Sequence, residues 1–316
     1  MTLDDATKER FGELAEVLSA CREAFLRITD DHHWEPAPGS VAAQDITEYT
    51  RMGIRDPRIV LMTVCCGLQD GANNCGGMCG LFVTGEAIGT VEQLTRSVLE
   101  GCAYAAWTIG DNPPAQDPKG RLARTYIQHR WSTVKAKEDA QRLGGKESAP
   151  FLAAAETFKA VRAELDAAFP LTTGKDLDHP ITVSGQTAVG LTAAVQWFME
   201  LVGRYGGGGL DRTVTEGLYG FLSNSTHPTL YTILQRLRPV AHTGHWGSAQ
   251  EVDIEHFERL TKFAVGTMYN ALAWVYHYAG WEFDVDSEFA AVIERVLPDF
   301  FRAETANERP TENGEE

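Results

Sequence analysis

The chain has 316 residues, of which 43% are hydrophobic and 23% are charged, and its formal net charge at pH 7 is −16. A chain of this length and composition can bury a substantial core, as ordinary globular proteins do. The strong negative charge opposes non-specific binding to nucleic acid and to anionic lipid, so neither is expected as a partner.

The N-terminal third predicts two helices separated by a loop. Apolar residues recur every three or four positions over 6–29, as on an amphipathic helix. Pro, Gly and acidic residues predict a loop over 30–45. The next helix is expected over 57–82, although each of its five glycines costs about 1 kcal/mol relative to Ala. Such a helix requires neighbours packed against its backbone, or a break near Gly76-Gly77.

The stretch 90–110 predicts the helix around which the rest of the chain is organised. Its apolar residues keep helical spacing, and 101–110 contains no charged residue. We expect this helix to be central and buried, with the other helices packed around it. Arg96 and Glu100 lie one turn apart on another side of it, at the spacing of an ion pair.

The remainder of the chain is also predicted to be helical. The helix boundaries are indicated by a glycine stop at Gly144-Gly145, a capping residue at Asp211 and prolines at helix starts. We find no strand, hairpin signal or internal repeat. The expected helices cover 120–143, 150–169, 186–205, 211–222, 228–237, 253–278 and 287–301.

These patterns predict an all-α fold, an irregular multi-helix bundle of roughly nine helices. We expect a single helical domain over residues 1–302, followed by a disordered acidic tail over 303–316. The glycine run 206–209 is expected to be a loop within that domain.

The termini, the hydropathy and the cysteines predict a cytoplasmic protein. The N-terminal segment is charged and lacks the apolar run of a secretory signal. The longest uncharged stretch, 180–199, is only moderately apolar, so we expect no membrane span. Six cysteines in such a chain indicate reduced thiols rather than a disulfide framework.

Arg96 and Glu100 are the first candidates for chemistry. An exposed pair at this spacing stabilises a helix by a few tenths of a kcal/mol, so one interpretation is a structural ion pair. In the other interpretation, a half-buried glutamate between apolar turns serves as an acid or a base. The pattern of one helix does not decide between them.

Asp70, Asn73 and Asn74 lie in the glycine-rich helix, where Asp and Asn have low helix propensity. If these side chains are buried, each needs a hydrogen-bond partner. Two alternatives follow: a structural network that binds Arg96 of the neighbouring helix, or the lining of a ligand pocket.

The cysteines give no metal-site pattern, and we expect no metal and no cofactor. A zinc site typically uses two pairs of closely spaced ligands, whereas adjacent cysteines on a helix point about 100° apart. Free cysteine is also a common small core residue. The cluster in question comprises Cys65, Cys66, Cys75 and Cys79.

Most histidines fall in loop-like segments, including His32-His33 and His242-x2-His245, and are expected at the surface. His227 differs because it stands between a helix end and Pro228. In that position it is a candidate to cap a helix, to hydrogen-bond a carboxylate, or to act as a base.

The pattern Arg124-x4-His129 is similar to the Arg-x4–6-His signature of HEPN-type helical ribonucleases. In those proteins the Arg and His of two protomers converge on an RNA phosphate. Arg236-x5-His242 matches as well, and with nine histidines one or two chance matches are expected. Only the local net charge of +6 over 119–146 distinguishes the first match.

Three further motifs together resemble a known group of proteins. They are Arg96-Ser97-x-Leu99-Glu100 followed by Trp107, Arg121-x2-Arg124, and Tyr219-x2-Leu222-Ser223-x3-His227. The chain resembles over residues 59–237 a large group of all-helical actinobacterial proteins of unknown function, which are distantly similar to helical domains of the HEPN superfamily. The resemblance implies a bundle in which Asp70, Arg96, Glu100 and His227 converge on one polar centre. It implies no reaction.

The chain thus supports three hypotheses of function. The first is a small-molecule-binding or small-molecule-processing protein, in which Asp70, Arg96, Glu100 and His227 supply acid–base or anion-binding groups. The second is a non-catalytic helical interaction or regulatory protein, and the third is a HEPN-like ribonuclease. Whether the protein is an enzyme stays open, and apolar helix faces also allow a homodimer.

Overall fold

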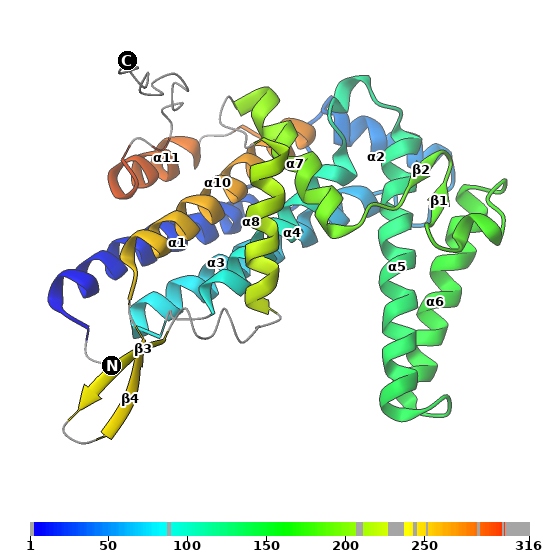
Figure 1. Ribbon diagram of the computed structural model, residues 1–316. Coiled ribbons are helices and arrows are strands. Elements are labelled where there is room, and N and C mark those ends of the chain that lie inside the picture. Colours follow the sequence, from blue (N-terminus) through cyan, green and yellow to red (C-terminus); the bar gives the residue numbers. More distant parts are fainter. Residues whose placement is uncertain are drawn as a thin grey trace, which may run out of the picture.

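The computed structural model describes residues 3–86, 90–206, 211–226, 237–242, 245–250, 252–282, 285–298 and 300. This part of the chain contains ten α-helices and two short antiparallel strand pairs, so the predicted all-α bundle is confirmed (Figure 1). None of the described helices is both long enough and apolar enough to cross a membrane. The predicted tail over 303–316 lies outside the described residues.

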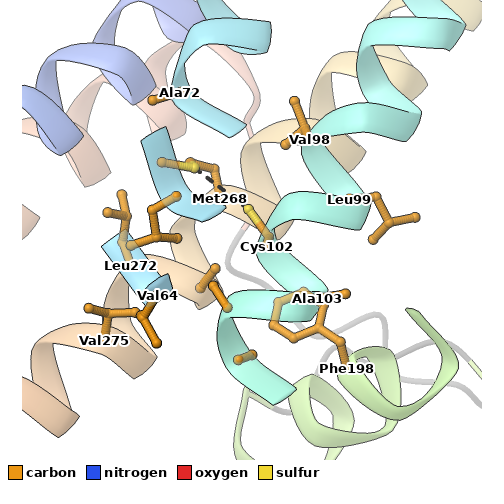
Figure 2. Close-up of a cluster of buried hydrophobic side chains, with 14 of the residues drawn as sticks. Val64, Ala72, Val98, Leu99, Cys102, Ala103, Phe198, Met268, Leu272 and Val275 are labelled. Atoms are coloured by element: carbon orange, nitrogen blue, oxygen red, sulfur yellow. Dashed lines mark hydrogen bonds between the residues drawn. The ribbon is translucent and has the colours of Figure 1, made fainter. Parts of the chain in front are cut away.

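The predicted central helix is α4 (Val91–Ile109). It contacts α3 (Ile59–Thr84), α7 (Leu191–Gly206), α8 (Arg212–Thr226) and α10 (Ile254–Ala279). Figure 2 shows Cys102 of α4 facing Met268 of α10, with Phe198 of α7 nearby. All three side chains are buried, and the two sulfur atoms lie 3.7 Å apart. The charge-free half of α4 is therefore buried in the core, as its sequence predicts.

Helix α3 runs without interruption, so the break considered at Gly76-Gly77 does not occur. Its backbone closely approaches that of α4: a Cβ on Gly101 would stand 2.8 Å from the carbonyl oxygen of Gly67. A Cβ on Gly71 would stand 3.2 Å from Cys102 Sγ. Neighbouring helices thus pack against the glycine backbone, and this packing stabilises a helix of low intrinsic propensity.

The N-terminal helix α1 (Asp5–His32) packs on α3, α10 and α11 (Val285–Val296). A helix that the sequence analysis missed, α2 (Val41–Arg51), follows it and packs on α10. The predicted loop over 30–45 is wrong at both ends, because α1 continues to His32 and α2 begins at Val41. Ser40 caps α2 by accepting a hydrogen bond from the Ala43 N–H (3.1 Å).

Helices α5 (Pro118–Gly144) and α6 (Ala149–Ala168) form a hairpin that stands away from the other helices (Figure 1). Its base is buried over 121–127 and is covered by a short strand pair, β1 (Thr182–Val183) and β2 (Gln186–Thr187). Two 3₁₀ turns flank the hairpin along the chain: η1 (Pro113–Ala115) precedes α5, and η2 (Lys175–Leu177) follows α6. The helix expected from Gln186 therefore begins only at Leu191, as α7.

A second strand pair is formed by β3 (Leu237–His242) and β4 (His245–Gln250). The strands are antiparallel, and His242 pairs with His245 in register. The expectation of no strands is therefore wrong here, because strand formation depends on pairing between two segments and Pro and Gly weaken the local strand pattern. The helix predicted over 228–237 lies outside the described residues except for Leu237, which begins β3.

Candidate functional site

Helices α4 and α8 lie side by side in opposite directions. Arg96 of α4 hydrogen-bonds to Tyr219 of α8, and one turn earlier on α4 the Gln93 side chain donates to the backbone oxygen of Ser225 (3.1 Å). The start of α8 is fixed by Asp211, whose carboxylate accepts from the Val214 N–H (2.9 Å). This confirms Asp211 as the N-cap, and the cap holds Tyr219 two turns into the helix.

Arg96, Glu100 and Tyr219 form a closed hydrogen-bonded triangle. Arg96 Nε–H donates to Glu100 Oε1 (2.6 Å), and Tyr219 O–H donates to the same oxygen (2.7 Å). Arg96 Nη2 also donates to the Tyr219 hydroxyl (3.3 Å), and its guanidinium lies 5.3 Å from the centre of the tyrosine ring. The ion pair predicted from the four-residue spacing is present and half-buried.

The triangle raises the pKa values of two of its members, Tyr219 and Arg96. Burial and the hydrogen bond to Glu100 raise the pKa of Tyr219 to about 12, so the phenol stays protonated and remains a donor. Burial tends to lower the pKa of Arg96, but the hydrogen bonds to Glu100 and Tyr219 outweigh it and raise that pKa overall. Arg96 is therefore a permanent cation already shared between two partners.

Asp70 of α3 is next to this triangle. Its Oδ2 lies 3.6 Å from where a Cβ on Gly101 would stand, and Gly101 directly follows Glu100. Burial, and then the charge of Glu100, raise the pKa of Asp70. Its carboxylate takes no hydrogen bond and no salt bridge from the described residues. We call Asp70, Arg96, Glu100 and Tyr219 the polar centre.

The network that was considered between Asp70 and Arg96 does not form among the described residues. The neighbouring Asn74 instead donates to the backbone oxygen of Asp70 (2.8 Å), while the side chain of Asn73 is exposed. Three of the four predicted site residues thus lie close together on α3 and α4. The fourth, His227, lies outside the described residues.

Two tyrosines of this region were not selected from the sequence. Tyr219 belongs to one of the sequence motifs, and Tyr104 belongs to none of them. Tyr104 lies one turn beyond Glu100 on α4, and burial together with the charge of Glu100 raises its pKa. The only available signal for Tyr104 was its spacing of four residues from Glu100, which many solvent-exposed pairs share.

A second polar cluster, also missed, lies at the base of the hairpin. Arg121 of α5 makes two hydrogen bonds of 2.6 Å to the carboxylate of Asp45 on α2. Tyr278 of α10 donates to Asp45 Oδ2 (2.8 Å), and Arg121 also donates to the backbone oxygen of Pro113 (2.9 Å). All donors and acceptors come from separate elements, so this cluster joins α2, α5 and α10 inside the core.

Arg124 and His129, the candidate ribonuclease pair, both have structural partners. The Arg124 guanidinium is buried and donates to the backbone oxygens of Thr108 and Ile109 at the end of α4 (3.1 and 3.2 Å). Burial lowers its pKa to about 10. His129 Nε2 lies 2.9 Å from the Thr63 hydroxyl, and burial lowers the pKa of His129. Arg124 therefore caps a helix end.

The cysteines lie mostly in the core. Cys75 and Cys102 are buried, Cys79 is half-buried and Cys66 is exposed, and all six thiols of the chain are free. Burial raises the pKa of Cys65 and Cys102 well above the usual range. Within the described part of the chain, no three His, Cys, Asp or Glu side chains are placed to hold a metal ion.

Comparison of the chain with protein-family models, with curated proteins and with solved structures finds no match.

Proposed function

We propose that the protein binds a small molecule through the polar centre, and that this molecule carries a cationic donor group such as an amine or a guanidinium. The observation that supports the proposal is the carboxylate of Asp70, an exposed residue whose pKa is raised beside Glu100 and whose carboxylate has no partner among the described residues. A cationic group placed there would gain charge-assisted hydrogen bonds.

The charges of the polar centre favour a cation over an anion. When both carboxylates are ionised, they exceed the single guanidinium of Arg96 by one negative charge. Arg96 is already hydrogen-bonded to Glu100 and to Tyr219. A ligand cation at Asp70 would therefore remove a like-charge repulsion, whereas an anion would add to it.

The same polar centre also suits proton transfer. A carboxyl group with a raised pKa spends more time protonated near neutral pH, and it can exchange its proton with a bound amine or alcohol. Small-molecule processing is thus an extension of the binding proposal.

The proposal is tested by the thermal unfolding of the protein with a panel of small aliphatic amines, guanidinium compounds and matched carboxylic acids. We expect some cationic members to raise the Tm, and we expect Asp70→Asn to abolish that rise. Asp139→Asn is the matched control, since Asp139 is an exposed carboxylate on α5 far along the hairpin. A Tm that no cation raises, or a rise that survives in Asp70→Asn, would contradict the proposal.

A second candidate function is a non-catalytic interaction protein. The observation that favours it is the hairpin of α5 and α6, which extends beyond the packed helices and has no buried side chain over 130–163. In this proposal the polar centre serves only to join α4 and α8. Glu100→Gln would then lower stability and leave partner binding unchanged.

We also propose a cellular compartment and a family relation for the protein. Six free thiols support a reducing compartment such as the cytoplasm. The relation to all-helical actinobacterial proteins, and more distantly to HEPN domains, rests on the sequence motifs alone.

A further inference from the structure

The hairpin of α5 and α6 lacks a core of its own along most of its length. None of the side chains over 130–163 is buried, whereas α4 is buried along most of its length. Figure 1 shows that none of the other described helices lies beside this part of the hairpin. We call residues 130–163 the arm. Two helices alone bury little apolar surface, so such a hairpin usually completes its packing against further helices.

Two cations of α5 pack on an aromatic ring of α6 in the arm. The guanidinium of Arg130 and the ammonium group of Lys137 lie 3.9 and 3.8 Å from the centre of the Phe158 ring. Such contacts are weak where they are exposed to water. They hold α5 and α6 together without covering the outer faces of the arm.

Large apolar side chains remain exposed on the arm. Trp131 is 40% exposed, Leu152 is 54% exposed, and Leu143 at the tip is 90% exposed. Trp131 contacts the ring of His179 and the ammonium of Lys135 and still stays partly exposed. Apolar surface placed along a protruding element is typical of an interaction site.

The arm differs in charge from the rest of the protein. It contains seven Lys/Arg and four Asp/Glu, a net charge of +3, while the remainder of the chain carries −19. A partner that complements the arm must therefore be acidic and must offer helical surface. The rest of this same chain has both properties, and it is present wherever the arm is present.

We propose that the arm binds a second copy of the protein, with each arm lying against the acidic helices of its partner. Two equivalent contacts related by a twofold axis close the assembly as a dimer. Contact between the two arms themselves is less favourable, because each carries a net positive charge. This proposal does not depend on the polar centre and goes beyond the proposed ligand.

The first experiment is sedimentation velocity of the wild-type protein from about 1 to 100 µM, the range in which interfaces of moderate affinity dissociate. We expect a dimer at the upper concentrations. Raising the salt from about 0.05 to 0.5 M shortens the screening length and should increase the dissociation constant by at least about tenfold. A wild type that is monomeric throughout overturns the proposal.

The second experiment reverses charges on the arm. Lys135→Glu, Arg142→Glu and Lys146→Glu are combined in one variant, in which all three sites are exposed. The control combines Lys8→Glu, Arg51→Glu and Lys262→Glu, which give the same change in net charge away from the arm. The two sets are matched in their ion pairs. In each set two residues pair with a nearby carboxylate, and the third, Lys146 or Lys262, has no ion pair among the described residues.

We expect the arm variant to raise the dimer dissociation constant by at least about tenfold and the control by less than about threefold, as for loss of one or two charge pairs. Leu152→Glu should also weaken the dimer, in contrast to Val83→Glu on α3, which is 71% exposed. Circular dichroism confirms that each variant is folded. Equal effects of the arm and control variants overturn the proposal, as does a monomer whose arm binds RNA or anionic vesicles instead.

Discussion

The protein contains two arginine–carboxylate pairs that look alike in chemistry and differ in setting. The side chains of Arg121 and Asp45 are 2% and 1% exposed, while those of Arg96 and Glu100 are 16% and 21% exposed. The first pair joins residues 76 positions apart, and the second joins residues four apart on one helix. Burial and sequence distance together decide whether such a pair maintains the fold or remains accessible to a ligand.

This difference has a physical basis. A buried charge without its partner is expensive because the protein interior solvates it poorly, so the members of the inner pair depend on each other. Each member of the outer pair keeps some contact with water and therefore can change partners at lower cost. A binding site is thus expected at the outer pair and not at the inner one.

The largest expected effect is that of Asp45→Asn at the inner pair. This change leaves the Arg121 guanidinium buried without a counter-charge, and it replaces one of the two oxygens that accept from Arg121 and Tyr278 with an NH2 donor. The free energy of unfolding should fall by about 3–5 kcal/mol, as measured by denaturation in urea. Glu48→Gln on the same helix, whose ion pair with Arg51 is exposed, should lower the free energy of unfolding far less. Similar losses for both variants would remove the distinction between the two settings.

The second prediction concerns the approach of α3 and α4 that brings Asp70 close to the outer pair. Gly101→Ala would place a methyl group 2.8 Å from the backbone oxygen of Gly67. The helices must then separate, and unfolding should become easier by about 1–3 kcal/mol. Gly80→Ala is the control, because its Cβ meets nothing within 4 Å. That change should stabilise α3 by up to about 1 kcal/mol. If both variants behave alike, the close approach is not a constraint.

The third prediction concerns the outer pair itself. Glu100→Gln removes a charge that Arg96 and Tyr219 share, and the loss of stability should be about 1 kcal/mol. The pKa of Tyr219, raised to about 12 by burial and by this hydrogen bond, should fall towards the usual tyrosine value. The difference in ultraviolet absorbance during alkaline titration, relative to Tyr219→Phe, reports it. An unchanged titration would show that Glu100 does not control the phenol.

The smallest expected effect is that of Asp70→Asn. The pKa of Asp70 is higher in the folded protein than in the unfolded chain, so folding favours its protonated form. The stability linked to this group is fully present below the unfolded pKa, and it is lost as the pH rises through the folded pKa. At neutral pH, Asp70→Asn should therefore stabilise the protein slightly, by a few tenths of a kcal/mol after solvent screening.

The pH dependence provides the check on this last prediction. The advantage of Asp70→Asn over wild type should disappear near pH 3, where Asp70 is protonated in both states. Asp139→Asn, at an exposed carboxylate on α5, is the control for the loss of one negative charge. Constant stabilisation by Asp70→Asn at every pH would indicate a cause other than ionisation.

The sequence alone predicted most helices because their apolar stripes repeat at helical spacing. The sequence did not predict α2, because few features distinguish that segment from a loop. They are the N-cap Ser40 and three side chains that are buried in the structure, Ala42, Asp45 and Tyr49. It also missed β3 and β4, which depend on pairing between two segments rather than on a local period. Sequence patterns therefore predicted those elements whose apolar spacing lies within a single helix.

What the sequence by itself determined is the all-α class, the central position of α4 and the pairing of Arg96 with Glu100, because each of these depends on residues within a few turns. Only the tertiary structure decided that Tyr219 closes the outer triangle, that Asp70 is left without a partner among the described residues, and that Arg121 and Asp45 meet in the core. Those contacts join residues from different helices. Their distances follow from helix packing, which no local spacing in the sequence specifies.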